Sequence, residues 1–160
     1  MKTYNPLQHQ GSVFSILENV PFLGGITETQ RSLIFNYFET AWFEAGEFVA
    51  RKGETPTHLY IIKSGLVGLV LESEGAFVSK RQFYAGDSFG EAALLSLINN
   101  TASFRADEAS ELIVLSRKSL NKLRKEDPDI FTTLMVNMAR ELARKLQYTD
   151  DMLLRRESSQ

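Results

Sequence analysis

The sequence has 160 residues, of which 43% are hydrophobic and 24% are charged. A chain of this length and composition suits one globular domain with its own core, for which 11 Phe, 5 Tyr and 1 Trp supply bulky side chains. The formal net charge of -2 lacks the basic excess of a nucleic-acid-binding domain, so direct DNA binding is not expected. The absence of cysteine excludes disulfides, thiol catalysis and cysteine-ligated metals.

The N-terminal run 1–10 is polar, and no later segment approaches about 18 consecutive apolar residues, the length that a membrane-spanning helix needs. The sequence therefore predicts a cytoplasmic protein without a secretory signal and without a membrane partner.

Helix signals begin at Thr27, where Thr27 and Gln30 have the spacing of a capping box. A shorter helix is predicted over 13–17, and Pro21 with the Gly24–Gly25 pair breaks the chain between the two helices. The apolar face of the second helix is predicted to consist of Leu33, Ile34, Tyr37 and Phe38.

From about residue 40 to residue 116 the chain consists of short Phe-, Val-, Ile-, Leu- and Tyr-rich runs without helical periodicity. The predicted strands are 47–49, 59–62, 67–71, 77–84, 101–106 and 111–115, with turns at Gly46, Gly53, Gly65, Gly75, Gly86 and Gly90. Many short strands joined by turns indicate an antiparallel β-roll or jelly roll and not a parallel α/β sheet.

After Arg117 the period becomes helical again, first in a short segment that contains Leu120 and Leu123. Asp127 and Pro128 then form an N-cap and a first helical residue, which predicts a long helix over about 128–156. This helix would be about 40 Å long. Its apolar stripe is predicted to contain Phe131, Met135, Met138, Leu142, Leu146 and Leu153.

Two interpretations of this stripe stay open. In the first interpretation, the helix is too long for a small β-roll to cover, so part of its stripe is free to contact a second copy of the chain. A near-heptad stripe suits such pairing. Alternatively, the helix folds back along its own roll. We favour a homodimer.

A Gly-x-x-Phe-Gly-Glu turn at 86–91 precedes the small apolar run 92–95, which is typical of a tight loop that enters a short helix. Free N–H groups at such a helix start bind oxyanions, with help from the helix dipole. A close backbone approach to a phosphate at Gly90 leaves no room for a side chain.

This cassette resembles the phosphate-binding cassette of cyclic-nucleotide-binding domains, which carry Phe-Gly-Glu, a short helix and then Arg-(Ser/Thr/Ala)-Ala. The resemblance extends over about 17–154, to the long dimerisation helix of bacterial catabolite-activator-type regulators. It rests on Phe89-Gly90-Glu91, Asn100-Thr101-Ala102, Phe43-x-x-Gly46-Glu47, His58-Leu59-Tyr60-Ile61-Ile62-x-x-Gly65, Asp127-Pro128-Asp129-Ile130 and Met138-Ala139-Arg140.

The resemblance implies an antiparallel roll with N-terminal helices, and a cyclic nucleotide, cAMP or cGMP, as the ligand. It also implies that Glu91 accepts a hydrogen bond from the ribose 2'-hydroxyl, although Glu91 has a structural alternative as a cap of the short helix. The site that it implies consists of Phe89, Gly90, Glu91, Ala92, Ala93, Asn100, Thr101 and Ala102.

The chain departs from the family pattern at Asn100, where the family has an Arg that pairs with the phosphate. A carboxamide is neutral and shorter than a guanidinium, so losing two charge-assisted hydrogen bonds would weaken phosphate binding by about two to four orders of magnitude. Strand alternation predicts that Arg105 points away from the pocket as a solvated residue. Lys80 and Arg81 stay open as substitute cations.

Base recognition also departs from the family, in which hydroxyl side chains on the long helix reach the adenine. Alignment on Met138-Ala139-Arg140 places Lys145 and Leu146 at this point, and Thr149 lies one turn further on.

These observations predict an N-terminal extension over 1–16 and a cyclic-nucleotide-binding-like regulatory domain over 17–160. The expected mechanism is ligand binding at 86–102, relayed through 117–127 and the long helix. The chain ends at residue 160, which leaves no room for the DNA-binding part of the regulators, so we expect either a stand-alone sensor or part of a longer protein.

Two other functions stay open. The first is a degenerate domain that binds no ligand and serves as a dimerisation or protein-interaction module for an unknown partner. The second is a cupin-like metal enzyme, which the two histidines, His9 and His58, disfavour because such sites need several imidazole or carboxylate ligands. No catalytic serine, phosphate loop or bound cofactor is expected, so we do not expect an enzyme.

Overall fold

Two antiparallel sheets and five α-helices make up the described part of the chain in a computed structural model, which describes residues 2–8 and 10–159. The α-helices are α1 (Gln10–Leu17), α2 (Glu28–Ile34), α3 (Glu91–Ser96), α4 (Arg117–Glu126) and α5 (Pro128–Ser158), with single 3-10 turns at Pro21–Leu23 and Phe35–Tyr37. The strands are β1 (Asn5–Pro6), β2 (Phe38–Phe43), β3 (Phe48–Ala50), β4 (His58–Ser64), β5 (Val67–Ser73), β6 (Ala76–Phe83), β7 (Ser88–Phe89), β8 (Ser103–Ala106) and β9 (Ser110–Ser116).

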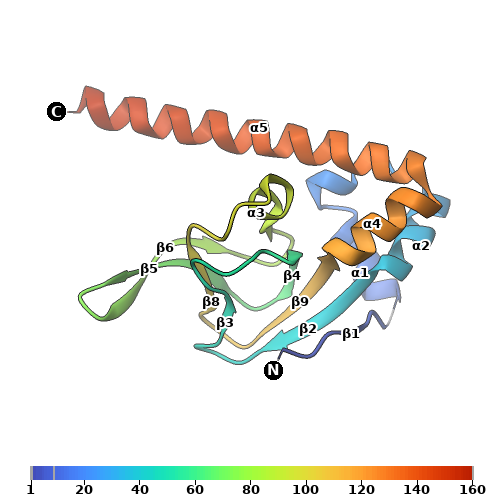
Figure 1. Cartoon of the computed structure of the whole chain (residues 1–160), viewed down its shortest axis with the longest axis horizontal. Helices are drawn as coiled ribbons and strands as arrows, with labels where there is room; N and C mark the ends of the chain where they lie inside the picture. The colour runs from blue at the N-terminus through green and yellow to red at the C-terminus, as the bar shows by residue number, and fades with distance from the viewer. Residues whose placement is uncertain (1, 9, 160) are drawn as a thin grey trace.

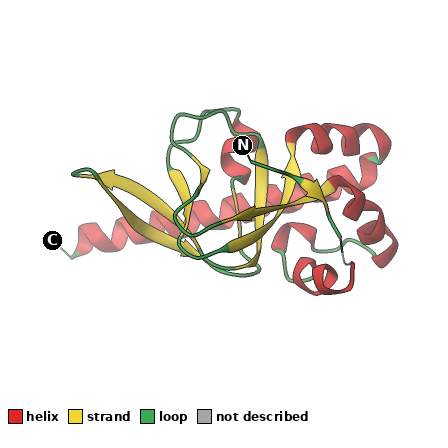
Figure 2. Ribbon diagram, turned by 90° about the horizontal axis from the view of Figure 1, so that it is seen from below, coloured by secondary structure: helices red, strands yellow, loops and turns green. Residues whose placement is uncertain are grey.

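The strands form a five-stranded sheet in the order β1-β2-β9-β4-β7 and a four-stranded sheet in the order β3-β8-β5-β6. Each strand pair described is antiparallel. The sheets face each other and form the roll, and α1, α2 and α4 gather at one end of it (Figures 1 and 2). The predicted antiparallel β-roll with N-terminal helices and a long C-terminal helix is confirmed.

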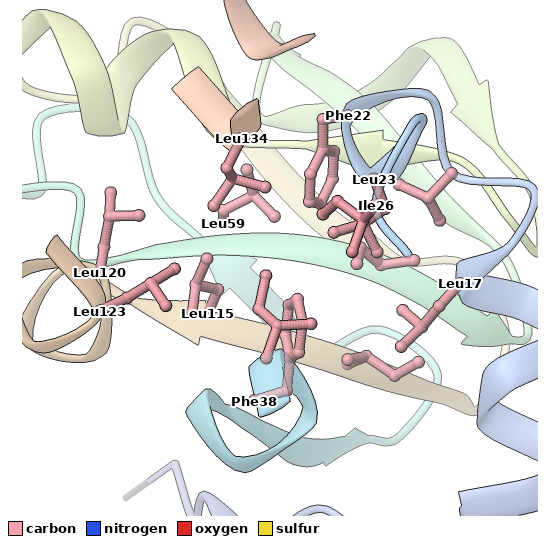
Figure 3. Packing of buried hydrophobic residues seen from close by; sticks show 14 of the residues in the cluster. Leu17, Phe22, Leu23, Ile26, Phe38, Leu59, Leu115, Leu120, Leu123 and Leu134 are labelled. Carbon is pink, nitrogen blue, oxygen red and sulfur yellow. The ribbon is translucent and has the colours of Figure 1, made fainter. Parts of the chain in front are cut away.

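The central strands β4 and β9 of the five-stranded sheet are buried on both faces, so they have runs of apolar residues. On β9, Ile113 and Leu115 pack against the helices, and Leu112 and Val114 pack inside the roll. The period of two along a strand explains this division. The helix-side core is shown in Figure 3, where Leu59 and Leu115 of the sheet meet Leu123 and Leu134 of the helices, together with Phe22 and Phe38.

The helix starts form as the sequence predicts. Thr27 accepts a hydrogen bond from Gln30 N at 3.2 Å, and Gln30 Oε1 accepts one from Thr27 N at 3.0 Å, which completes the capping box. Asp127 Oδ1 accepts a hydrogen bond from Ile130 N at 3.1 Å at the start of α5.

Several predicted boundaries are wrong. The helix predicted over 13–17 begins at Gln10, and the strand predicted over 77–84 ends at Phe83. Phe38 does not continue the helical face, because it begins β2, where its main chain pairs with Leu115. The strand predicted over 101–106 begins at Ser103. The turn glycines, in contrast, all have positive φ, as their turns require: Gly46, Gly53, Gly65, Gly75, Gly86 and Gly90.

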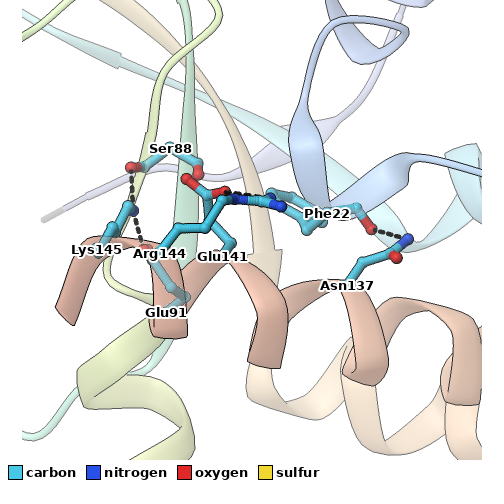
Figure 4. Close-up of polar contacts among 7 residues, drawn as sticks. All are labelled: Phe22, Ser88, Glu91, Asn137, Glu141, Arg144 and Lys145. Carbon is cyan, nitrogen blue, oxygen red and sulfur yellow. Dashed lines mark hydrogen bonds and ion pairs between the residues drawn. The ribbon is translucent and has the colours of Figure 1, made fainter. Parts of the chain in front are cut away.

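Helix α5 has three parts that differ in their contacts. Its first turns contribute Ile130, Leu134 and Met138 to the helix-side core. Asn137 Nδ2 donates to Phe22 O at 3.2 Å and Gly24 O at 2.6 Å, and the middle of the helix crosses α3 (Figures 1 and 4). The last part carries exposed apolar side chains, Leu146, Tyr148, Met152, Leu153 and Leu154.

The stripe predicted on α5 is therefore partly covered by the chain itself. Met138 is buried and Phe131 and Met135 pack against the core, whereas Leu146 and Leu153 are 62% and 54% exposed. No helix in residues 2–8 or 10–159 is both long and apolar enough to cross a membrane.

Candidate functional site

The cassette residues line a cavity of about 370 Å³ beside α3. Gly90, Ala92 and Ala93 form one side of it, and Leu69 and Phe104 of the four-stranded sheet form part of the rest. A cavity of this volume lies in the range of small-molecule sites. Asn100, Thr101 and Ala102 also line it, so the structure brings together most of the residues that the sequence analysis singled out.

Gly90 is fixed by its backbone and by its neighbours. Its φ of +88° lies in the left-handed region, and it is the N-cap of α3. A Cβ at this position would lie 3.0 Å from His58 O and 3.1 Å from Tyr60 Cδ2. The turn therefore needs glycine, for chain geometry alone as well as for the close phosphate approach expected from the sequence.

Glu91 is buried, at 4% exposure, in the first turn of α3. Its Oε1 accepts a hydrogen bond from Lys145 Nζ of α5, and Lys145 also donates to Ser88 O at 3.3 Å (Figure 4). Its second oxygen, Oε2, is buried without a hydrogen-bond partner. A buried carboxylate oxygen without a donor is energetically costly. Glu91 itself is not among the residues that line the cavity, although its neighbours Gly90 and Ala92 are.

Phe89 does not line the cavity, although it belongs to the same motif. Its ring stacks on Tyr60, with centroids 5.0 Å apart, and on Phe104, with centroids 4.6 Å apart. It is buried in the core of the roll, where it connects the cassette to the wall of the cavity.

Asn100 is 8% exposed and lines the main cavity together with a smaller one of about 30 Å³. Its backbone is fixed on both sides, because Asn100 N donates to Glu54 O at 2.9 Å and Asn100 O accepts from Gly53 N at 2.7 Å. The side chain thus lies where the resemblance places a phosphate-binding group, but it carries no charge.

None of the cations considered from the sequence lines either of these cavities. Arg105 points away from the cavity, as predicted, but it is not a solvated surface residue, because its side chain is 27% exposed and pairs with Asp107 at 3.5 Å. Arg81 lies over the Phe83 ring at 4.9 Å, and Lys80 is exposed on β6.

The α5 positions that align with the family's base contacts do not act together in this structure. Lys145 pairs with Glu91, whereas Leu146 is exposed. Thr149 Oγ1 donates to Lys145 O at 2.9 Å within the helix.

The pairing of Lys145 with Glu91 was not predicted from the sequence. A signal was present, because Lys145 lies seven residues after the buried Met138 and so belongs to the same face of the helix. Only the tertiary crossing of α5 over α3 shows that this face reaches the cassette.

A larger hollow of about 540 Å³ lies elsewhere, lined by Lys2, Trp42, Phe48, Arg51 and their neighbours. No cassette residue lines it. We consider the cavity of about 370 Å³ beside α3 the better candidate site, since the buried carboxylate of Glu91 lies in the same helix as its lining residues Ala92 and Ala93.

Among residues 2–8 and 10–159, no group of three or more His, Asp or Glu side chains is placed to hold a metal ion. The imidazole of His58 stacks on the Tyr4 ring at 4.2 Å. Burial first, and the charge of Lys2 second, lower the pKa of His58 to about 4. His9 lies outside the described residues.

Comparison with known proteins gives a family match. The model of the cyclic nucleotide-binding domain family matches residues 40–127, more than half of the chain. The cAMP-dependent protein kinase regulatory subunit of Schizosaccharomyces pombe is 30% identical over 109 residues, which are 68% of this chain and 26% of that protein.

Solved structures agree with this match. The catabolite activator protein of Thermus thermophilus has a TM-score of 0.72 and 28% identity, over 83% of this chain and 61% of that one. The regulatory subunit of a cAMP-independent protein kinase A from Trypanosoma cruzi, bound to guanosine, has a TM-score of 0.61 and 25% identity, over 74% and 41% of the two chains. The chain spans about a quarter of the length of the S. pombe relative.

Proposed function

Since the chain belongs to the cyclic nucleotide-binding domain family, a family of regulatory and not catalytic domains, we propose that it binds a cyclic nucleotide, cAMP or cGMP, in the cavity beside α3. The observation that carries this proposal is the unsatisfied carboxylate oxygen of Glu91. Its buried Oε2 has no hydrogen-bond partner, and the residues on either side of it, Gly90 and Ala92, line the cavity. A ribose hydroxyl is a donor of the kind that this oxygen lacks.

Ligand binding would be relayed through α5. Lys145 pairs with Oε1, the other oxygen of Glu91. A ligand that donates to Oε2 would change the negative charge on Oε1, and with it the strength of the pairing with Lys145. The ligand can shift the position of α5 only by binding more tightly to one arrangement of the helix than to the other. The short helix α4, which links the roll to α5, would move with it.

A homodimer through α5 would give this relay an output. The exposed apolar residues of the distal half include Leu146, Leu153 and Leu154, and a second copy of the same helix would cover them.

Asn100 favours a second candidate, a neutral nucleoside in place of a cyclic nucleotide. A carboxamide can bond a neutral hydroxyl or amide, but it offers no charge to a phosphate. The T. cruzi relative is described as cAMP-independent and bound to guanosine. The third candidate, the degenerate interaction module, requires that neither kind of ligand binds.

Isothermal titration calorimetry with cAMP, cGMP, adenosine and guanosine separates these candidates. We expect saturable binding of a cyclic nucleotide at one site per chain, lost in Glu91→Ala. Glu111→Ala removes a carboxylate that pairs with Lys63 and lines neither of the two cavities, so it is the matched control and should bind as the wild type does. Saturable heat with nucleosides alone supports the second candidate, and silence with all of them supports the third.

A further inference from the structure

The cavity beside α3 has no cation of its own. Of the described residues that line it, none is Lys or Arg. An anionic ligand that enters a partly buried cavity without a cation loses its hydration and gains no ionic partner, which is unfavourable. A phosphate group there needs positive charge from another part of the chain.

Lys2 is connected to this position through a second cavity. The cavity of about 30 Å³ adjoins the main one, since Gly90, Asn100 and Phe104 line both. Among the described residues that line the smaller cavity, Lys2 is the one Lys or Arg, and His58 is neutral at physiological pH because its pKa is lowered to about 4.

The segment that carries Lys2 is docked on the roll. Strand β1 pairs with β2, with Asn5 opposite Thr40. The Tyr4 ring stacks on His58, whose carbonyl oxygen abuts Gly90. Lys2 Nζ donates to Val49 O, which leaves two of its three N–H donors for other acceptors.

The opposite charge in the smaller cavity is Glu54. Its carboxylate accepts a hydrogen bond from Arg51 N at 3.0 Å, and Glu54 lines the smaller cavity together with Lys2. With Lys2 in place the two charges offset each other. Without Lys2 the wall behind Asn100 would be negative and would repel an anion.

We propose that segment 2–6 forms part of the ligand site and that the ammonium group of Lys2 supplies the positive charge that Asn100 does not. This inference rests on the proposed function and adds that the ligand is recognised as an anion. A lysine is a flexible point charge, so it acts through its field on a phosphate and does not need the bidentate geometry of Arg. Its four-carbon stem also allows it to exchange Val49 O for a ligand oxygen.

Calorimetry on Lys2→Gln tests the proposal, with cAMP as the anionic probe and adenosine as its neutral counterpart. We expect Lys2→Gln to weaken cAMP binding by about 5- to 50-fold and to leave adenosine binding unchanged. Lys2→Arg should keep the wild-type affinity for cAMP. Lys118→Gln, which removes an exposed positive charge on α4, is the matched control and should change neither.

The outcomes are distinguishable. Equal cAMP affinity in the wild type and Lys2→Gln overturns this inference alone and leaves the proposed function intact. An equal loss for cAMP and adenosine also overturns it, because Lys2 would then act by holding the segment in place and not by charge. A wild type that binds neither cAMP nor cGMP overturns both the inference and the proposed function.

Discussion

Replacing Asn100 by Arg restores the charged group that the family has at this position, and the structure allows its effect to be worked out. The backbone at Asn100 is held by hydrogen bonds to Glu54 O and from Gly53 N, which any side chain preserves. Asn100 lines the cavity, so a longer side chain at this position can extend into its volume of about 370 Å³. The substitution should therefore keep the fold and extend a guanidinium toward the ligand.

The expected gain follows from the bonds that form and the freedom that is lost. Two charge-assisted hydrogen bonds to a phosphate contribute about 3–6 kcal/mol, and ordering an Arg side chain costs about 2 kcal/mol. The net gain of about 1–4 kcal/mol corresponds to about 5- to 1000-fold tighter binding of cAMP. Adenosine, which lacks the phosphate, should gain nothing.

The assay is calorimetric titration of Asn100→Arg and of its neighbour variant Asn99→Arg. Asn99 also lines the cavity but is exposed, so a cation there measures the general effect of added charge. We expect a large gain only at position 100. An equal gain at both positions, or none at millimolar cAMP, would show that the cavity lacks the phosphate position inferred from the cassette.

Four further predictions concern the contacts around this site. Lys145→Ala leaves Glu91 buried without its cation and should lower the free energy of unfolding in urea by about 1–3 kcal/mol. The double variant with Glu91→Gln should recover most of that loss, and losses that simply add would contradict the pairing. The pKa of His58 is lowered from 6.5 to about 4 in the folded chain, so on acidification the unfolded chain takes up the His58 proton at a higher pH than the folded chain does. The free energy of unfolding should therefore fall by about 1–2 kcal/mol as the pH drops from 6.5 to 4, a value that allows for solvent screening of the half-buried ring. This loss should be absent in His58→Gln, and an identical pH profile in both proteins would refute it. Leu134→Ala should destabilise by about 2–5 kcal/mol and the exposed Val136→Ala by less than about 1 kcal/mol, measured by thermal unfolding; similar values would mean that α5 does not pack as described. In sedimentation velocity at tens of micromolar, the wild type should be a dimer and Leu146→Glu with Leu153→Glu a monomer, whereas a monomeric wild type would contradict pairing through α5.

The parts of the fold that local chemistry determines could be predicted from the sequence. The Thr27 and Asp127 caps depend on side chains three residues from their partners, and the turn glycines depend on their own φ. The long helix was predicted from a periodic stripe and from the start that Asp127 and Pro128 form. These features do not depend on how the chain folds over itself.

The features that were missed depend on tertiary contacts. Strands β1 and β7 have two residues each, too short for any periodicity, and they exist because β2 and β4 offer them a hydrogen-bonding edge. Phe38 fits a helical face equally well in sequence, and only its pairing with β9 makes it a strand residue.

The candidate site shows the same division. The cassette motif identified Gly90, Ala92 and Asn100, which line the cavity. Two lysines come from distant elements: Lys145 pairs with Glu91, and Lys2 is the cation that we propose for the phosphate. Lys145 is 54 residues from Glu91 in sequence, and Lys2 belongs to a segment that was predicted to be a mere extension. No local sequence motif specifies that either lysine lies near the cassette.

The central claim is that a cyclic nucleotide enters the cavity beside α3 and is reported to α5 through Glu91 and Lys145. A titration with cAMP and cGMP followed by ¹H–¹⁵N NMR spectra tests both halves at once. The account predicts saturable shifts of the amides of residues 90–93 and 100–102, accompanied by shifts in α5 around Lys145 with the same midpoint. Spectra that stay unchanged up to millimolar concentrations of both nucleotides would contradict it.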